Sequence, residues 1–180
     1  LEDNYIKLYE KNFVQMSFSQ ELVNGLYLNS RLSYEKRNPL FNSTNQTFYN
    51  DKEDAYTSNN PLNPTVYGTI PFNTHNIFKL NVSARINFAQ QYLSYPDSKF
   101  NINNGKYPSL ILGYEKGFAA TNSNYNFDQI KARISQGFYI GNKGYFRYNL
   151  KTGHFFNADD IAFMDYKHFN GNQTNISRGN

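Results

Sequence analysis

Apolar and polar residues alternate without a break from residue 78 to residue 88, in the order Phe78-Lys79-Leu80-Asn81-Val82-Ser83-Ala84-Arg85-Ile86-Asn87-Phe88. Successive side chains of a β-strand point to opposite faces, so this stretch predicts a strand with one apolar and one polar face. Continued to Tyr92, the strand exceeds the roughly 5–6 residues usual in globular proteins. Its length matches the roughly 9–11 residues with which a tilted strand crosses a bilayer.

Five further stretches alternate in the same way and predict strands at 9–21, 26–36, 107–118, 125–140 and 145–155. Ile111 interrupts the alternation of its stretch. Val23-Asn24-Gly25 and Gly141-Asn142-Lys143-Gly144 are typical of tight hairpin turns. The predicted fold class is therefore all-β: an antiparallel meander of about six long strands, forming a fragment of a transmembrane β-barrel that is not closed.

The links between these strands differ in length. The segment 38–76 is polar and interrupted by prolines, and it predicts a long surface loop. Outer-membrane barrels keep short turns on the periplasmic side, so this loop is expected at the cell surface. Two links, 93–106 and 119–124, fit this rule poorly. The first of them is expected to start with a turn at Tyr95-Pro96-Asp97-Ser98. Residues 157–180 are expected to be loop-like.

Composition agrees with a membrane barrel. The 180 residues fit one partial barrel domain, 1–180, and they include 16 Tyr and 16 Phe but no Cys and no Trp. The mean hydropathy of -0.73 argues against helical spans, but only every second residue of a barrel strand faces lipid. The basic residues are scattered, so no nucleic-acid partner is expected. Both ends of the sequence look like cuts through a longer protein, whose remaining strands would complete the barrel.

The polar faces of the predicted strands carry most of the charged residues. In a barrel such faces line the lumen, and we interpret these residues as a lumen-facing polar wall. A basic lumen could favour anions or hold a plug, whereas a ladder of charges could simply fill and brace the wall. The residues of this predicted wall are Arg31, Lys79, Arg85, Lys131, Arg133, Arg147, Lys151, Glu35 and Glu115.

Candidate catalytic and metal-binding groups are sparse. The three histidines, His75, His154 and His168, share no ligand spacing and are interpreted as solvated loop residues. Asp159-Asp160 with Asp165 could bind a hard cation, but the spacing of a calcium loop is absent. No phosphate-binding loop or nucleophile elbow is present. We therefore expect no enzymatic activity, no cofactor and no metal site.

Several short runs of the sequence carry a resemblance to a known family. The runs are Gln20-Glu21-Leu22, Asn24-Gly25-Leu26-Tyr27, Arg37-Asn38-Pro39-Leu40-Phe41-Asn42, Tyr114-Glu115-Lys116-Gly117, Asn126-Phe127-Asp128, Gly153-His154-Phe155-Phe156-Asn157 and Lys167-His168-Phe169-Asn170-Gly171-Asn172-Gln173-Thr174. Together they resemble an uncharacterised outer-membrane β-barrel family of Bacteroidetes. The resemblance implies a Gram-negative outer-membrane location and a small carboxypeptidase-regulatory-like domain near the N-terminus of the parent, without peptidase activity. It implies no site residues.

The function expected from these observations is that of an outer-membrane barrel with a structural or transport role, surrounded by outer-membrane lipid. One alternative is a barrel that assembles or exports outer-membrane or surface proteins. Another is a soluble β-sandwich or small barrel that binds a ligand, because such folds also alternate apolar and polar residues.

Overall fold

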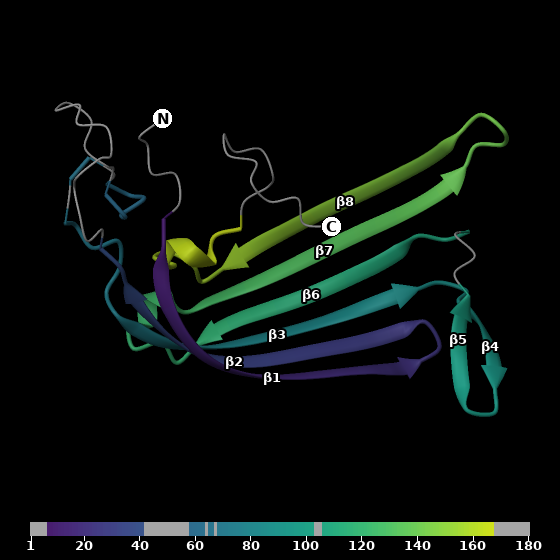
Figure 1. Ribbon diagram of the computed structural model, residues 1–180, viewed down its shortest axis with the longest axis horizontal. Coiled ribbons are helices and arrows are strands. Elements are labelled where there is room, and N and C mark those ends of the chain that lie inside the picture. The colour runs from purple at the N-terminus through teal and green to yellow at the C-terminus, as the bar shows by residue number, and fades with distance from the viewer. Residues whose placement is uncertain (1–6, 42–57, 64, 67, 103–105, 168–180) are drawn as a thin grey trace, which may run out of the picture.

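A computed structural model of the chain describes residues 7–41, 58–63, 65–66, 68–102 and 106–167. Its main feature is one antiparallel sheet in the order β1-β2-β3-β6-β7-β8 (Figure 1). A separate hairpin pairs β4 with β5, and two short 3-10 helices, η1 and η2, complete the fold. The bounds are β1 Tyr9–Val23, β2 Leu26–Pro39, β3 His75–Asn87, β4 Gln91–Tyr95, β5 Ser98–Ile102, β6 Ser109–Phe118, η1 Ser123–Tyr125, β7 Phe127–Tyr139, β8 Tyr145–Phe156 and η2 Phe163–Asp165.

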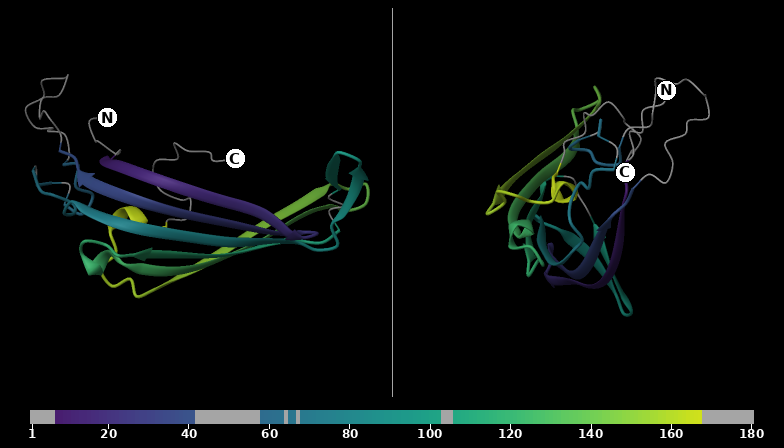
Figure 2. Two further views of the ribbon diagram at one scale, coloured as in Figure 1. Left: turned by 90° about the horizontal axis from the view of Figure 1, so that it is seen from below. Right: turned by 90° about the vertical axis from the view of Figure 1, so that its left-hand side faces the viewer.

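The predicted all-β meander of six long strands is confirmed. Each of the six strands pairs with its neighbours in the predicted order, and they are 10 to 15 residues long. Among the described residues, β1 and β8 do not pair with each other, so the sheet is open. Figure 2 shows this sheet curved into a trough.

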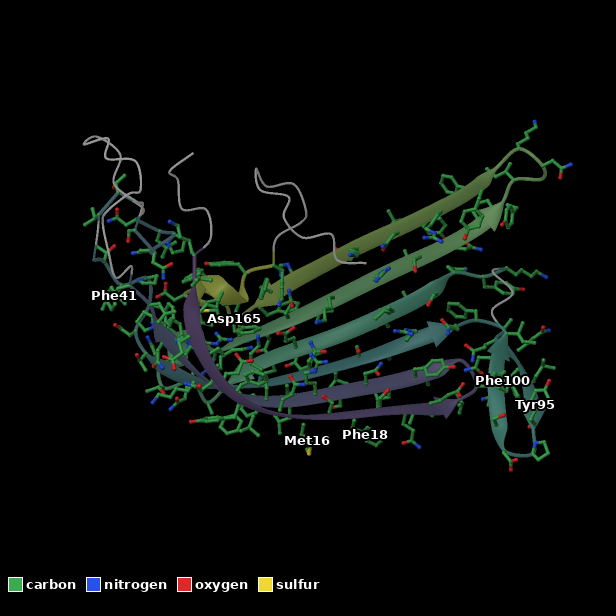
Figure 3. All side chains as sticks on the ribbon, in the orientation of Figure 1. Met16, Phe18, Phe41, Tyr95, Phe100 and Asp165 are labelled. Atoms are coloured by element: carbon green, nitrogen blue, oxygen red, sulfur yellow. The ribbon has the colours of Figure 1, made fainter. Side chains whose placement is uncertain are left out.

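The register gives the trough two chemically distinct faces. Every cross-strand pair joins two odd or two even residue numbers, except Val23–Leu26 after the irregularity near Glu21. We call the even-numbered positions of the six strands the convex face and the odd-numbered positions the concave face. Met16 and Phe18 point outward from the convex face (Figure 3).

Burial is opposite to that of a water-soluble sheet. On the convex face Val14 is 75% exposed, Met16 70% and Leu150 64%, whereas on the concave face Glu35 is 6% exposed and Glu115 5%. The charged residues of the convex face all lie towards one end of their strands. They are Glu10, Lys36, Lys116 and Asp128.

The two ends of the trough also differ. One end, which we call the long-loop end, carries the connection from β2 to β3, the link with η1 and the chain after β8 (Figure 1). The opposite end, the short-turn end, carries the tight turns after β1 and β7 together with the β4–β5 hairpin. In the predicted loop 38–76, β2 runs to Pro39 and β3 begins at His75, and residues 42–57, 64 and 67 lie outside the described residues.

The prediction for the chain after residue 88 is wrong in two respects. Strand β3 ends at Asn87 and does not continue to Tyr92, because Ala89 adopts a positive φ of 49° that turns the chain. The link 93–106 contains most of a two-stranded hairpin whose turn is at the predicted residues, 95–98. Lys99 of this hairpin pairs with Glu21 at 3.1 Å, and Asn101 donates to the Tyr27 hydroxyl at 2.6 Å, so the hairpin is fixed to the β1–β2 turn.

The chain after β8 is loop-like over 157–167, as predicted, apart from η2, and the rest of the predicted loop, 168–180, lies outside the described residues. Residues 157–167 include η2 and lie on the concave side of the sheet at the long-loop end (Figure 2). Ile161 packs against Ile77 of β3 and Phe127 of β7 in the small hydrophobic core. Gly117 leaves room for this core, since a Cβ there would lie 2.6 Å from the Phe127 ring. In the described ranges no helix is long and apolar enough to cross a membrane.

Candidate functional site

A buried ionic network joins residues 157–167 to the concave face. Asp165, 1% exposed, accepts two hydrogen bonds from the Arg37 guanidinium, from Nη1 at 2.6 Å and from Nη2 at 3.0 Å. Arg37 also donates from Nε and Nη2 to Oε2 of Glu35, at 3.0 and 2.7 Å. One guanidinium thus joins a carboxylate of its own strand to one that lies 128 residues further along the chain.

Lys79 extends the network across the sheet. Its ammonium lies 2.8 Å from an Asp165 oxygen and 3.2 Å from Glu115 of β6. Glu115 also pairs with Lys131 of β7 at 3.1 Å and accepts a hydrogen bond from Asn81 at 3.0 Å. Alternating positive and negative groups therefore link β2, β3, β6, β7 and η2.

The charge of Asp165 is stabilised by its partners. Burial alone favours the neutral acid, but the hydrogen bonds and positive charge of Arg37, together with Lys79, outweigh it. As a result the pKa of Asp165 lies below its usual value of 3.8. The carboxylate is ionised at neutral pH, as the network requires.

Acid should release residues 157–167 from the concave face. The lowered pKa means that the released segment binds a proton more readily than the docked one. The stabilisation is therefore complete above the ordinary Asp value and is lost as the pH falls through the lowered pKa, below about pH 4. Hydrogen exchange of the amides of 161–166, corrected for intrinsic rates, should show this loss of protection. Asp165→Asn should already exchange rapidly at neutral pH, and protection that persists in acid would contradict the prediction.

The structure places all nine residues of the predicted polar wall on one face, the concave one. It brings together Glu35, Glu115, Lys79 and Lys131 in or beside the buried network. The other five residues are exposed, and none of them forms an ion pair within the part of the chain that is described. They are Arg31, Arg85, Arg133, Arg147 and Lys151. Whether this face lines a lumen stays a prediction.

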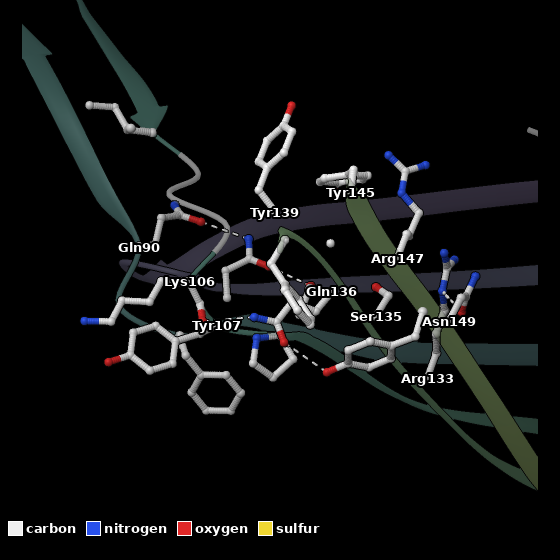
Figure 4. A pocket seen from close by; sticks show the side chains of 18 residues that line it. Gln90, Lys106, Tyr107, Arg133, Ser135, Gln136, Tyr139, Tyr145, Arg147 and Asn149 are labelled. Carbon is white, nitrogen blue, oxygen red and sulfur yellow. Dashed lines mark hydrogen bonds between the residues drawn. The ribbon is translucent and has the colours of Figure 1, made fainter. Parts of the chain in front are cut away.

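Two of these unpaired arginines line a pocket of about 770 Å³ at the short-turn end. Arg133 donates from Nε to the Asn149 side chain at 3.0 Å, and the Arg147 guanidinium lies 5.6 Å from the centre of the Tyr145 ring (Figure 4). Tyr145 in turn covers Gly137, where a Cβ would collide with the Tyr145 hydroxyl. The pocket thus combines guanidinium groups with aromatic rings.

The sequence-based interpretation missed the ion pair between the two most buried charged residues, Arg37 and Asp165. Arg37 lies at the end of its alternating stretch, beyond the predicted limit at Lys36, although its odd number places it on the polar face. Asp165 lies in a segment without alternation, so no local signal identified its partners. The ion pair became visible only when the fold brought β2 and residues 157–167 together.

The histidines and the acidic cluster do not form a metal site within the described residues. His75 is not solvated as predicted: it begins β3, is 2% exposed, and its ring lies 4.3 Å from that of Tyr125. His154 lies on β8, and His168 falls outside the described residues. Asp165 is bound by Arg37 and Lys79 and is therefore not available to join Asp159 and Asp160 around a cation.

Comparison with known proteins gives one result. The C-terminal domain model of a family of unknown function (DUF5686) matches residues 1–180. Searches among curated proteins and among solved structures found no match. The predicted resemblance to an uncharacterised family agrees with this match in so far as both families have no known function. The outer-membrane barrel and the N-terminal domain stay predictions. The chain belongs to the family of unknown function DUF5686, of which it represents the C-terminal domain.

Proposed function

We propose that this domain is part of a transmembrane β-barrel of a Gram-negative outer membrane, with a structural or transport role and no enzymatic activity. The observation that carries the proposal is the exposed apolar convex face opposite a charged concave face. Large contiguous apolar surfaces on soluble proteins are rare and mark contacts with a partner or a membrane. In barrels the lipid-facing and lumen-facing residues alternate in this manner.

Aromatic rings border the apolar surface at both ends. Towards the long-loop end, Phe78 lies between Tyr34 and Phe118, with ring centres 4.9 and 5.7 Å apart. Towards the short-turn end, Phe138 and Phe146 are 5.5 Å apart. Such rows resemble the aromatic girdles at the two interfaces of a membrane barrel.

The length of the apolar face suits a bilayer. Along β3 the apolar positions of the convex face run from Phe78 to Ile86, about eight residues, which corresponds to roughly 27 Å of strand at ~3.4 Å per residue. A strand tilt of about 40° reduces this to ~21 Å along the membrane normal, comparable with the roughly 25 Å apolar band of outer-membrane barrels. Among the described residues no second sheet covers the convex face, as a β-sandwich would require.

Fractionation tests the proposal. The full-length protein should remain with outer-membrane fragments after carbonate extraction and density separation, and it should require detergent for solubilisation. Recovery in the soluble fraction would contradict it and would favour the ligand-binding soluble alternative. In the membrane, edge strands β1 and β8 would pair with the remaining strands of the parent barrel, since lipid leaves no partner for open edges.

The long-loop end is expected at the cell surface. Thr65 is exposed in the β2–β3 connection, whereas Asn142 is exposed in the tight turn after β7, at the opposite end. In intact cells, a membrane-impermeant maleimide should label Thr65→Cys but not Asn142→Cys until the outer membrane is opened. The sequence contains no cysteine that would add background. The reverse pattern would invert the topology, and labelling of both sites in intact cells would argue against the barrel.

A further inference from the structure

We propose that the pocket at the short-turn end binds an anionic organic ligand that carries a planar ring. This inference rests on the proposed membrane barrel, because it names the class of molecule that the concave face would admit from the short-turn side. The three observations behind it are a row of like charges, an absence of acidic lining residues in the described chain, and aromatic rings beside the guanidinium groups.

The like charges follow from the strand register. Arg133 of β7, which lines the pocket, lies directly opposite Lys151 of β8. Arg85 of β3 lies in the same row, separated from Arg133 only by Ile111, and neither Arg85 nor Lys151 lines the pocket itself. Directly opposed residues on one face have Cβ atoms about 4.5–5.5 Å apart, and like charges at that distance destabilise a sheet. A bound anion would turn this repulsion into attraction.

Basic residues have different neighbours in the two halves of the concave face. At the long-loop end Arg37, Lys79 and Lys131 are neutralised by the carboxylates of the buried network. At the short-turn end the described residues that line the pocket include Arg133 and Arg147 but no Asp or Glu. If the basic residues served only to brace the wall, we would expect carboxylates beside them here as well.

The remaining lining groups indicate what the anion is attached to. Tyr107, Tyr139 and Tyr145 contribute aromatic rings, and Asn149 and Ser135 contribute neutral hydrogen-bonding groups (Figure 4). Arginine binds carboxylate, phosphate and sulfate through paired N–H groups, and its plane stacks on aromatic rings. The volume of about 770 Å³ lies within the range of small-molecule sites.

Phenyl phosphate is the simplest probe that has both chemical features. Titration into the full-length protein in lipid nanodiscs, followed by ³¹P line broadening, should show saturable binding. Arg133→Gln and Arg147→Gln should each weaken it about tenfold or more, since each removes a charged hydrogen-bond donor. Arg31→Gln is the matched control, because Arg31 lies on the same face but outside the pocket. It should change the affinity less than about twofold.

Two further arms separate the possible outcomes. Inorganic phosphate should bind about tenfold more weakly than phenyl phosphate, because it cannot stack on the tyrosines. Equal affinity for the two would overturn the assignment of a ring-bearing ligand. Heat-dependent gel mobility shows whether the protein has folded in lipid. If it has folded, and the wild type, Arg133→Gln and Arg31→Gln all bind phenyl phosphate equally well, the proposed site alone is overturned. Failure to fold in lipid would instead overturn the membrane barrel.

Discussion

Replacing Asp165 with alanine should release residues 157–167 from the concave face. The change removes one of two carboxylates from a guanidinium that is 1% exposed. Breaking a buried ion pair on one side costs about 3–5 kcal/mol, and because Glu35 still contacts Arg37 we expect the lower end of this range. A thiol introduced as Ala162→Cys, at a position that is 4% exposed, reports the release. Its labelling rate should rise about 100-fold, since ~1.4 kcal/mol corresponds to a factor of ten.

Asp160 provides the control for this experiment. It lies in the same segment but is exposed, and it accepts a 3.4 Å hydrogen bond from the Asn124 side chain. Asp160→Ala in the Ala162→Cys background should change the labelling rate by less than about threefold, as expected for a surface substitution. Equal rates in the Asp165→Ala and Asp160→Ala variants would show that the ionic network does not hold the segment.

Arginine at position 82 should destabilise the membrane-inserted protein far more than arginine at position 81. Val82 lies on the convex face in the middle of β3, between Ser30 of β2 and Tyr114 of β6. An arginine at a lipid-facing site near the bilayer midplane costs about 2–4 kcal/mol. The free energy of unfolding, measured by urea titration of the protein folded into lipid vesicles, should fall by that amount for Val82→Arg.

Asn81→Arg is the matched comparison, one residue away on the concave face. Asn81 already donates to Glu115 at 3.0 Å, so an arginine there meets a carboxylate instead of lipid. Its effect should stay below about 1 kcal/mol, as for other sites that face the lumen or solvent. Losses of equal size at the two positions would contradict the assignment of the two faces.

Much of the fold could be predicted because it follows from a local rule. Alternation over 78–88 placed Lys79 and Asn81 on one face and Leu80 and Val82 on the other, and Asn-Gly and Gly-Asn turns separated neighbouring strands. With short links on one side of each strand, the meander order followed. The register then kept the parity of residue numbers from β1 to β8, so nine predicted wall residues share a face.

The rest depends on contacts between distant segments. The β4–β5 hairpin has only five residues in each strand and is fixed by Lys99 and Asn101 to the turn after β1, about 75 residues earlier in the chain. Residues 157–167 have no alternation, and their position depends on Arg37 and Lys79. Periodicity cannot report such contacts, so the segment was expected to be a loop.

A pair of nitroxide labels on β3 tests the central claim most directly. Ser83 and Ala84 are small, adjacent residues on opposite faces of the sheet. Ser83, on the concave face, lies between Asn29 of β2 and Gly113 of β6, and Ala84, on the convex face, lies between Leu28 and Leu112. With the full-length protein in lipid vesicles, we predict that the label on Ala84→Cys collides with oxygen and not with a water-soluble nickel complex. The label on Ser83→Cys should show the lower oxygen and higher nickel accessibility of a position out of contact with lipid. Equal accessibility of both labels to the nickel complex would contradict the claim that the convex face lies in the membrane.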